Sequence, residues 1–324
     1  MAATIRDVAK EAGVSVATVS RVLNKNGYVS EESERKVLKA IKKLNYRPNS
    51  VARALFHKTS KMIGLIVPDI TNPFFPELAR AVEDVSMIYG YKVLLGNSDG
   101  NAEKEQTYID LFNQKYVDGV IMTGHSSERD ITLNSDTPVV VLDRASFSGL
   151  PTVTSNNYEG ARQATKLLIE KGAENIAHIR GPREITSAND RYRGFIDEIE
   201  ENNMSCVIEE SAFNLAAAEE VAHTFYDKFP HIDGVFCSND TIAVGFLKVA
   251  LKRGIQIPEE LQIVGFDGVA FGKMVYPELT TVAQPIYDLG AVASRLLIKL
   301  IENEEPEQKI YELETKVIER GTTR

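Results

Sequence analysis

Residues 4–24 consist of two short helical patterns that meet at Gly13 and Val14. Apolar residues recur every three or four positions in both patterns, which is typical of amphipathic helices. The residues on these inward faces are Ile5, Val8, Ala9, Ala12, Val19, Val22 and Leu23. Ser15 is a good N-cap for the second helix, and Gly13 permits a turn that a side chain would hinder. The spacing therefore predicts a helix-turn-helix that directs four residues of its second helix outward: Val16, Ala17, Ser20 and Arg21.

The charge of the chain is divided unevenly along its length. Residues 1–61 hold 13 Lys and Arg against 5 Asp and Glu, whereas the remaining 263 residues hold 24 against 41. A basic head on an acidic body favours contact with phosphates at one end only. The combination of pattern and charge therefore predicts DNA binding by the head, and it disfavours a purely structural helical bundle.

The residues after residue 24 extend this basic head. Ser30 precedes a third helical pattern with four inward residues, which are Val37, Leu38, Ile41 and Leu44, and five outward cations, which are Arg35, Lys36, Lys39, Lys42 and Lys43. Asn49 is positioned to cap residues 50–56, a segment too short to be a stable helix alone. We expect the order of that segment to depend on a partner.

This head resembles the LacI/GalR family of bacterial transcription regulators, and the resemblance runs from Thr4 to the C-terminus. It rests on Thr4-Ile5, Asp7-Val8-Ala9, Ala12-Gly13-Val14-Ser15 and Thr18-Val19-Ser20-Arg21-Val22-Leu23-Asn24. The resemblance implies a homodimer that binds a palindromic operator, with residues 48–60 as a hinge helix and linker. It implies that Leu55 of that hinge helix wedges into the minor groove and bends the DNA. The DNA contacts that it implies are Thr4, Ser15, Val16, Ala17, Thr18, Ser20, Arg21, Asn24, Asn49, Ala52 and Leu55.

Composition excludes several other classes of protein. Cys206 and Cys237 are too few for a disulfide framework, and the five histidines lack metal-ligand spacing. No apolar run approaches the length of a membrane span, and residues 1–10 do not resemble a signal peptide. We therefore expect a cytoplasmic protein without a cofactor, a metal or a membrane partner, and the family resemblance implies that it is bacterial and nucleoid-associated.

From residue 61 onward, short apolar runs alternate with amphipathic ones. The runs typical of strands are 63–67, 91–95, 119–122, 139–142, 176–179, 234–237, 262–266 and 316–319, and helical patterns cover 74–89 and 102–115. This βαβ alternation predicts parallel sheets with helices on both faces. The predicted fold is an all-α helix-turn-helix head plus an α/β, periplasmic-binding-protein-like domain of two doubly wound parallel-sheet subdomains.

The predicted domain bounds follow from this alternation and from the resemblance. The DNA-binding domain covers 1–47, the hinge helix and linker cover 48–60, and the effector-binding and dimerisation domain covers 61–324. Within that last domain, one subdomain covers roughly 61–159 plus 291–317. The other covers 160–290 and the C-terminal end.

Polar and aromatic residues follow several predicted strands, at Asp69 to Phe75, Asp143-Arg144, Asn239-Asp240 and Asp267. Ligands of doubly wound folds bind at the carboxyl ends of strands. Carboxylates, amides and a guanidinium suit the paired hydroxyls of a polyol, while aromatic rings cover its C–H faces. Any single Asp or Asn after a strand is more often a helix cap or a turn residue. We expect Asp240 to be the cap of a helix over 241–252.

The effector domain also resembles the periplasmic sugar-binding proteins, and in particular the ribose-binding protein. The matching segments include Asn72-Pro73-Phe74-Phe75, Leu142-Asp143-Arg144, Gly265-Phe266-Asp267-Gly268 and Ala283-Gln284-Pro285. This resemblance implies D-ribose as the effector. The residues that it implies as ribose ligands are Asn72, Phe74, Phe75, Asp143, Arg144, Arg191, Phe213, Asn239, Asp267 and Gln284.

The resemblance therefore implies a repressor of ribose-utilisation genes that leaves its operator when D-ribose closes the effector domain. A catabolite control regulator of the same family, activated by a phosphorylated carrier protein as co-repressor, is the alternative. Asp143-Arg144 together with Arg191 favours the ribose repressor, because that other branch lacks the Asp-Arg pair. A transport receptor is disfavoured by the basic head. An enzyme is not expected, because no phosphate-binding loop or Ser-His-Asp arrangement accompanies the carboxylates.

Overall fold

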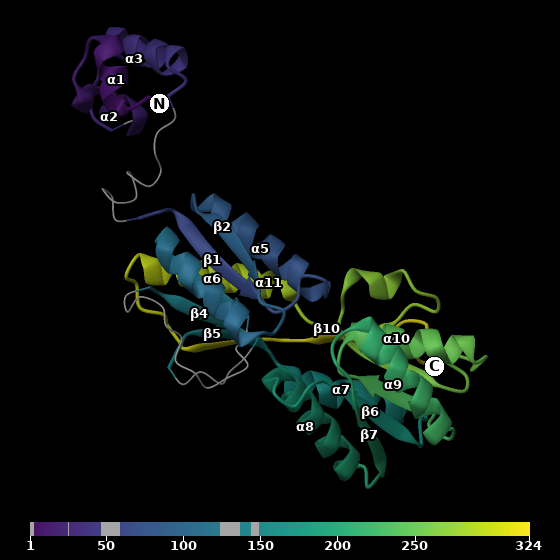
Figure 1. Cartoon of the computed structure of the whole chain (residues 1–324). Coiled ribbons are helices and arrows are strands. Elements are labelled where there is room, and N and C mark those ends of the chain that lie inside the picture. Colours follow the sequence, from purple (N-terminus) through teal and green to yellow (C-terminus); the bar gives the residue numbers. More distant parts are fainter. Residues whose placement is uncertain (1–2, 25, 47–58, 124–136, 144–148) are drawn as a thin grey trace. The chain divides into compact units, whose positions relative to one another are not determined.

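The computed structural model describes residues 3–24, 26–46, 59–123, 137–143 and 149–324. The chain forms two compact units, residues 1–60 and residues 61–324, which Figure 1 shows in sequence colours. The predicted hinge segment, including Asn49, Ala52 and Leu55, lies outside the described residues, as does Arg144.

The first unit contains three helices: α1 (Ile5–Ala12), α2 (Val16–Asn24) and α3 (Glu31–Lys43). Side chains cap each of them at the N-terminus. Thr4 and Asp7 form a capping box on α1, and the Ser15 Oγ accepts from the Thr18 N–H of α2 at 3.1 Å. Ser30 caps α3 through the Ser33 N–H. Gly13 ends α1 with a φ of 67°, a left-handed conformation that favours glycine.

The core of this head is formed by Val8, Val19 and Val37, which are fully buried, with Ala9, Ala12 and Ala40 around them. The predicted inward position of Leu38 is wrong, because its side chain is 52% exposed. Val37, Ala40, Ile41 and Leu44 form the inward stripe at a spacing of three or four residues, and Leu38 is rotated away from it by about 100°. Ala40, and not Leu38, is therefore the buried residue that completes this stripe.

The second unit contains two six-stranded sheets. The first sheet is parallel throughout and has the strand order β11-β5-β4-β3-β1-β2. Its strands are β1 (Met62–Val67), β2 (Lys92–Asn97), β3 (Gly119–Thr123), β4 (Val139–Leu142), β5 (Thr152–Ser155) and β11 (Ile310–Leu313). The helices α5 (Phe74–Ile88) and α11 (Ile286–Ile301) pack on one core cluster, and α6 (Ala102–Lys115) packs on another.

The second sheet has the order β12-β10-β9-β8-β6-β7, with β12 antiparallel to β10 and the other pairs parallel. Its strands are β6 (Ile176–Arg180), β7 (Cys206–Glu210), β8 (Gly234–Cys237), β9 (Gln262–Asp267), β10 (Thr280–Ala283) and β12 (Lys316–Ile318). One core cluster contains residues of α9 (Leu215–Lys228) and α10 (Asp240–Lys252), and another those of α7 (Asn157–Glu170) and α8 (Thr186–Glu201). A short 3-10 helix, η1, spans Ala270–Lys273.

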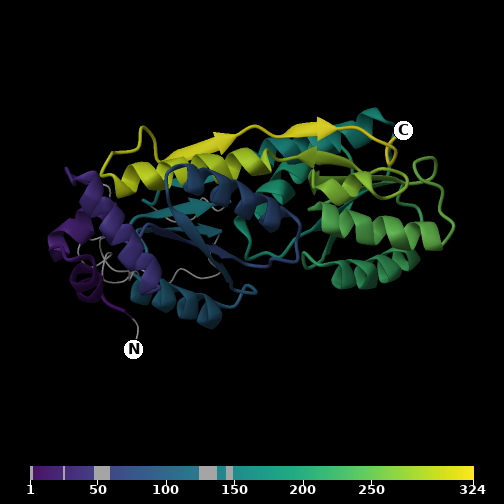
Figure 2. The same cartoon turned by 90° about the horizontal axis from the view of Figure 1, so that it is seen from above.

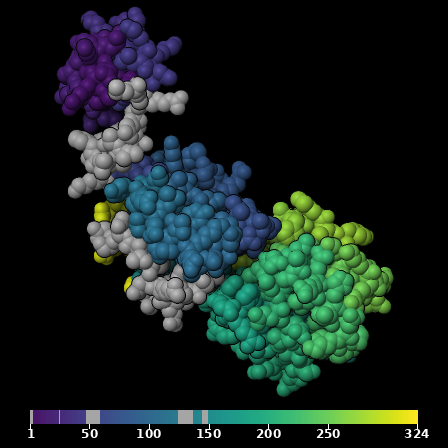
Figure 3. All heavy atoms as spheres, in the orientation of Figure 1, coloured from purple at the N-terminus to yellow at the C-terminus, as the bar shows by residue number. Residues whose placement is uncertain are grey.

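The predicted fold class is therefore confirmed: a helical head precedes two doubly wound subdomains, which Figure 3 shows as two lobes of the second unit, mainly blue and mainly green. Four strands that the sequence pattern did not predict are β5, β7, β10 and β11. β5 reads Thr-Val-Thr-Ser and β11 is half exposed, so neither forms an apolar run. Within the described residues, no helix is both long and apolar enough to cross a membrane.

The chain passes between the two sheets three times. The crossings lie between β5 and α7, between β10 and α11, and between β11 and β12. Figure 2 shows the third crossing in yellow, running from one subdomain to the other. The predicted subdomain bounds, after residues 159 and 290, fall inside α7 and α11, whereas the crossings lie where these helices begin.

His178, on β6, is completely buried among aromatic rings. Its ring is stacked on those of Phe195 and Phe236. Nδ1 donates to the carbonyl oxygen of Phe236 at 2.9 Å, and Nε2 has no partner within the described structure. Burial lowers the pKa of His178 to about 3. The folded protein therefore holds this imidazole neutral.

Acid should destabilise the protein partly through His178. Between pH 6.5 and about 3 the unfolded chain binds a proton at this residue that the folded chain does not. The free energy of unfolding therefore decreases as the pH is lowered, by up to about 1.4 kcal/mol per pH unit. We expect urea unfolding at pH 7.5, 6 and 5 to show a shallower loss for His178→Phe than for the parent. The exposed His223 provides the control, His223→Asn. Equal slopes for the parent and His178→Phe would contradict this account.

Candidate functional site

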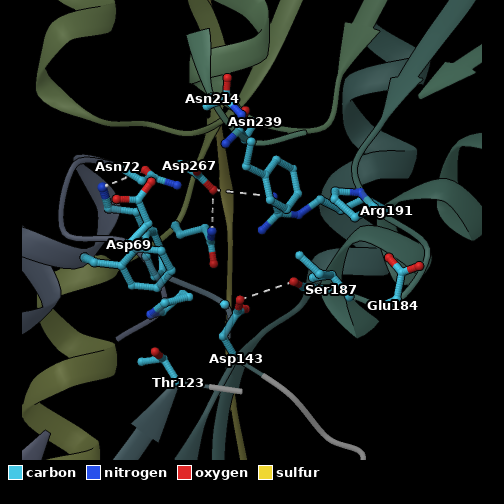
Figure 4. Close-up of a pocket in the computed structure, with 18 of the residues that line it drawn as sticks. Asp69, Asn72, Thr123, Asp143, Glu184, Ser187, Arg191, Asn214, Asn239 and Asp267 are labelled. Atoms are coloured by element: carbon cyan, nitrogen blue, oxygen red, sulfur yellow. Dashed lines mark hydrogen bonds and ion pairs between the residues drawn. The ribbon is translucent and has the colours of Figure 1, made fainter. Parts of the chain in front are cut away.

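A cavity of about 420 Å³ lies where the carboxyl ends of the two sheets face each other. Figure 4 shows polar side chains from both subdomains converging on it. We call it the central cavity. Its lining consists of Pro68, Asp69, Asn72, Phe74, Phe75, Asp99, Gly100, Thr123, Asp143, Pro182, Glu184, Ile185, Ser187, Arg191, Phe213, Asn214, Asn239, Asp267 and Gln284.

Strand ends position most of these side chains. In the first sheet, Asp69, Asp99 and Asp143 follow β1, β2 and β4, and Thr123 ends β3. In the second sheet, Asn239 follows β8, Asp267 ends β9 and Gln284 follows β10, while Arg191 projects from α8. A parallel sheet brings the carboxyl ends of neighbouring strands to one edge, so residues far apart in the sequence meet here.

Arg191 and Asp267 form a buried ion pair in the central cavity, with 3.5 Å between Nη1 and Oδ1. The guanidinium lies over the ring of Phe266, 3.8 Å from its centroid, and Nη1 also donates to the carbonyl oxygen of Ser238 at 2.6 Å. Burial raises the pKa of Asp267, while Arg191 opposes that rise. Within the described structure Arg191 donates hydrogen bonds from Nε and Nη1, so the Nη2 group is available to a ligand.

Gln284 extends the same polar group. Its Nε2 donates to Asp267 Oδ1 at 2.7 Å. Its buried Oε1 has no hydrogen-bond partner among the described residues. An unsatisfied buried acceptor is costly, and a hydroxyl group of a ligand would satisfy it.

Asn239 both lines the central cavity and caps a helix. Its Oδ1 accepts from the Ile242 N–H at 2.9 Å, so Asn239 is the N-cap of α10. The prediction that Asp240 is this cap is wrong. Asp240 is completely buried, and its carboxylate accepts from Thr281 Oγ1 at 2.6 Å and from the Val269 N–H at 2.9 Å. Burial and the nearby Asp267 raise the pKa of Asp240.

Asp143 connects the two subdomains across the central cavity. It follows β4 in the first sheet, with a φ of 62°. Ser187, in the first turn of α8, donates from Oγ to Asp143 Oδ2 at 3.2 Å, as the dashed line in Figure 4 shows. The two subdomains are therefore in contact through a pair of residues that both line the cavity.

Aromatic rings complete the lining. Phe74 and Phe75 meet edge to face, with 5.1 Å between centroids and 82° between planes, and Phe213 contributes from the loop before α9. The central cavity thus combines apolar rings with carboxylates, amides and a guanidinium. Such a lining suits a small neutral polyol, whose hydroxyls both donate and accept while its C–H faces contact rings.

The structure brings nine of the ten predicted ligands together in this lining, and the tenth, Arg144, lies outside the described residues. Their role as ligands stays a prediction. The polar cavity residues absent from the predicted set are Asp69, Asp99, Thr123, Glu184, Ser187 and Asn214. Asp99 and Thr123 could have been found from their places at strand ends. Glu184 and Ser187 follow β6 without a recognisable pattern, so the fold alone reveals them.

The head presents a second candidate surface. Val16, Ala17, Arg21 and Asn24 are exposed on α2, and Thr18 and Ser20 are half-buried beside them. Thr4 and Ser15 serve as caps, which does not prevent them from facing DNA. Lys36 and Lys43 on α3 form surface ion pairs with Glu32 and Glu11. For Lys39 and Lys42 the described structure contains no ion pair.

Comparisons with known proteins match both units. Residues 4–49 match the model of bacterial regulatory proteins of the lacI family. Residues 60–316 match the model of periplasmic binding proteins and the sugar binding domain of the LacI family. The chain belongs to the LacI family. It is accordingly a DNA-binding transcription regulator with an effector domain of the sugar-binding type.

Individual proteins are similar over between 81% and 99% of this chain. A ribose operon repressor from Halalkalibacterium halodurans is 54% identical, over 99% of this chain and 97% of that protein. A LacI transcriptional regulator from Alkaliphilus metalliredigens, complexed with D-xylulofuranose, is 36% identical, with a TM-score of 0.77 over 82% of this chain and 99% of that one. A LacI family regulator from Enterococcus faecium with bound ribose is 28% identical, with a TM-score of 0.74 over 81% of this chain and 98% of that one.

Proposed function

We propose that this LacI-family regulator represses ribose-utilisation genes and that D-ribose releases it from its operator. The observation that carries the proposal is the convergence of Asn72, Asp143, Arg191, Asp267 and Gln284, with aromatic rings beside them, on one cavity. The relative that is 54% identical, a ribose operon repressor, supports the proposal. The related regulator with bound ribose also supports it.

Each polar group can form a hydrogen bond with a hydroxyl group of a pentose. The carboxylates of Asp143 and Asp267 accept hydrogen bonds from sugar hydroxyls, Arg191 Nη2 donates to one, and Gln284 Oε1 accepts from one. The rings of Phe74, Phe75 and Phe213 contact the C–H faces of the sugar. A cavity of about 420 Å³ is large enough for one monosaccharide.

The release mechanism follows from the position of the cavity between the subdomains. D-ribose contacts both, so it binds their closed arrangement better and shifts the population toward it. In the proposed homodimer, this closure separates the two predicted hinge segments and removes Leu55 from the minor groove. Ribose binding thereby lowers the affinity for the operator.

The charge of the lining favours a free sugar over a phosphorylated one. Five carboxylates line the central cavity: those of Asp69, Asp99, Asp143, Glu184 and Asp267. Among the described lining residues Arg191 is the cation, and it is paired with Asp267. A phosphate dianion would lose its hydration here and meet charges of its own sign.

Titration calorimetry with D-ribose tests the proposed effector. We expect saturable binding by the full chain, weakened by Asp267→Ala at least about 30-fold, because a hydrogen-bonded charged group is lost. The control Asp190→Ala removes a carboxylate that pairs with Arg193 outside the cavity and should bind normally. No heat with ribose, but binding of a phosphorylated carrier protein, would instead establish the catabolite control alternative.

Ribose 5-phosphate should bind at least about 100-fold more weakly than D-ribose, because its phosphate has no unpaired cation to meet among the described lining residues. Competition calorimetry measures the ratio. The difference should shrink at high salt, which screens the exposed carboxylates Asp99 and Glu184. Tighter binding of the phosphorylated sugar would contradict the assignment of a free sugar.

A separate prediction concerns DNA recognition by the head. Arg21→Ala should relax base preference at one operator position by about 1–3 kcal/mol, because its exposed guanidinium reads a base edge. Lys39→Ala should weaken binding to all DNA sequences alike, and it should lower the slope of log affinity against log salt concentration by about 1. Binding to a randomised operator pool at several salt concentrations separates the two effects. Identical specificity profiles for both variants would count against this assignment.

A further inference from the structure

Asn157, the first residue of α7, does not line the central cavity, yet it connects a cavity residue to the chain crossing between the subdomains. Its side chain is 3% exposed. Oδ1 accepts from Arg191 Nε at 2.9 Å, and Nδ2 donates to the carbonyl oxygen of Ser155 at 3.0 Å. Ser155 is the last residue of β5, where the chain leaves the first sheet.

The first and third crossings are themselves joined. The Asn156 N–H donates to the carbonyl oxygen of Leu313 at 2.9 Å, and Thr315 Oγ1 donates to the carbonyl oxygen of Asn156 at 3.5 Å. The side chain of Asn157 is therefore bonded to the first crossing, and the neighbouring Asn156 backbone joins that crossing to the third. Any rotation of one subdomain against the other must change backbone angles at these crossings.

The second crossing is connected to the same ion pair by another route. Gln284 begins this crossing, and its side chain donates to Asp267, the partner of Arg191. The buried Arg191–Asp267 pair is thus hydrogen-bonded toward all three crossings. This arrangement places the crossings within two hydrogen bonds of groups that line the cavity.

The packing of α8 on α7 makes the contact of Arg191 with Asn157 specific. Gly194 lies one turn after Arg191, and a Cβ there would approach the carbonyl oxygen of Tyr158 to 2.2 Å. Only glycine lets α8 come this close to the beginning of α7. The short guanidinium-to-amide distance therefore depends on a close helix contact and not on a flexible side chain.

We propose that Asn157 is a positioning residue that transmits the effector-bound state of Arg191 to the crossings, and so couples sugar binding to subdomain closure. The inference rests on the proposed function for its ligand, D-ribose. It predicts that binding and response can be separated. Breaking the bond from Asn157 to Ser155 should uncouple the response while Arg191 stays in place.

Asn157→Asp makes this separation. The carboxylate still accepts from Arg191 Nε, but it no longer donates to the Ser155 carbonyl oxygen. Asn189 offers a matched control, because it also accepts from an arginine, Arg180, at 2.5 Å and donates to a carbonyl, that of Arg183, at 2.8 Å. Its bonds lie away from the crossings. Asn189→Asp therefore applies the same chemical change without touching the crossings.

The experiment measures D-ribose affinity by calorimetry and operator affinity by fluorescence anisotropy, with and without saturating ribose. For Asn157→Asp we expect ribose affinity within about threefold of the parent, whereas the factor by which ribose weakens operator binding should fall from at least about five to below about two. Asn189→Asp should respond like the parent. An unchanged ribose effect in Asn157→Asp would overturn the inference.

Hydrogen exchange of the ligand-free full chain tests the same inference without relying on ribose. The Asn156 amide should exchange at least about tenfold faster in Asn157→Asp, and not in Asn189→Asp. Arg191→Lys should also accelerate it, and the double variant should add little to either change. Unaltered exchange at Asn156 would overturn the inference even if ribose proved not to be the effector. Absence of any ribose effect on the parent would instead refute the proposed function.

Discussion

The buried ion pair of Arg191 and Asp267 is the interaction on which the effector domain depends. Burying two charges costs free energy that their attraction alone does not offset. Here the carbonyl oxygen of Ser238, the Asn157 and Gln284 side chains and the ring of Phe266 surround the pair. The buried Gln284 Oε1 still lacks a hydrogen-bond partner within the described structure, and the hydrogen bonds of Arg191 there are made by Nε and Nη1, which leaves Nη2 for a ligand. The site is therefore nearly complete without a ligand, and the hydroxyls of a sugar are suited to complete it.

The same pair is hydrogen-bonded to residues at the chain crossings between the two subdomains. Gln284 belongs to one crossing between the subdomains, and Asn157 is bonded to another. Asp143 meets Ser187 from the opposite side of the cavity. Binding groups and crossing segments thus share one hydrogen-bonded network, whereas the head has a separate core of small apolar residues.

The sequence was informative wherever a pattern repeats. The spacing of Val8, Val19 and Val37 and the cap residue Ser15 specified the head. Leu38 was misplaced because it is apolar but lies beside the inward stripe of α3. Asp240 was mistaken for a cap because two adjacent residues, Asn239 and Asp240, can both serve, and only tertiary contacts decide between them. No sequence pattern indicates the proposed role of Asn157, because that role depends on a contact between α7 and α8 that forms only in the folded chain.

The most direct test of the central claim is the affinity of the full chain for D-ribose, measured with and without saturating operator DNA. If ribose and operator favour opposite arrangements of the subdomains, the operator must weaken ribose binding by the same factor by which ribose weakens operator binding. We expect this equality, with a factor of at least about five. Equal ribose affinity in the presence and absence of operator would contradict it.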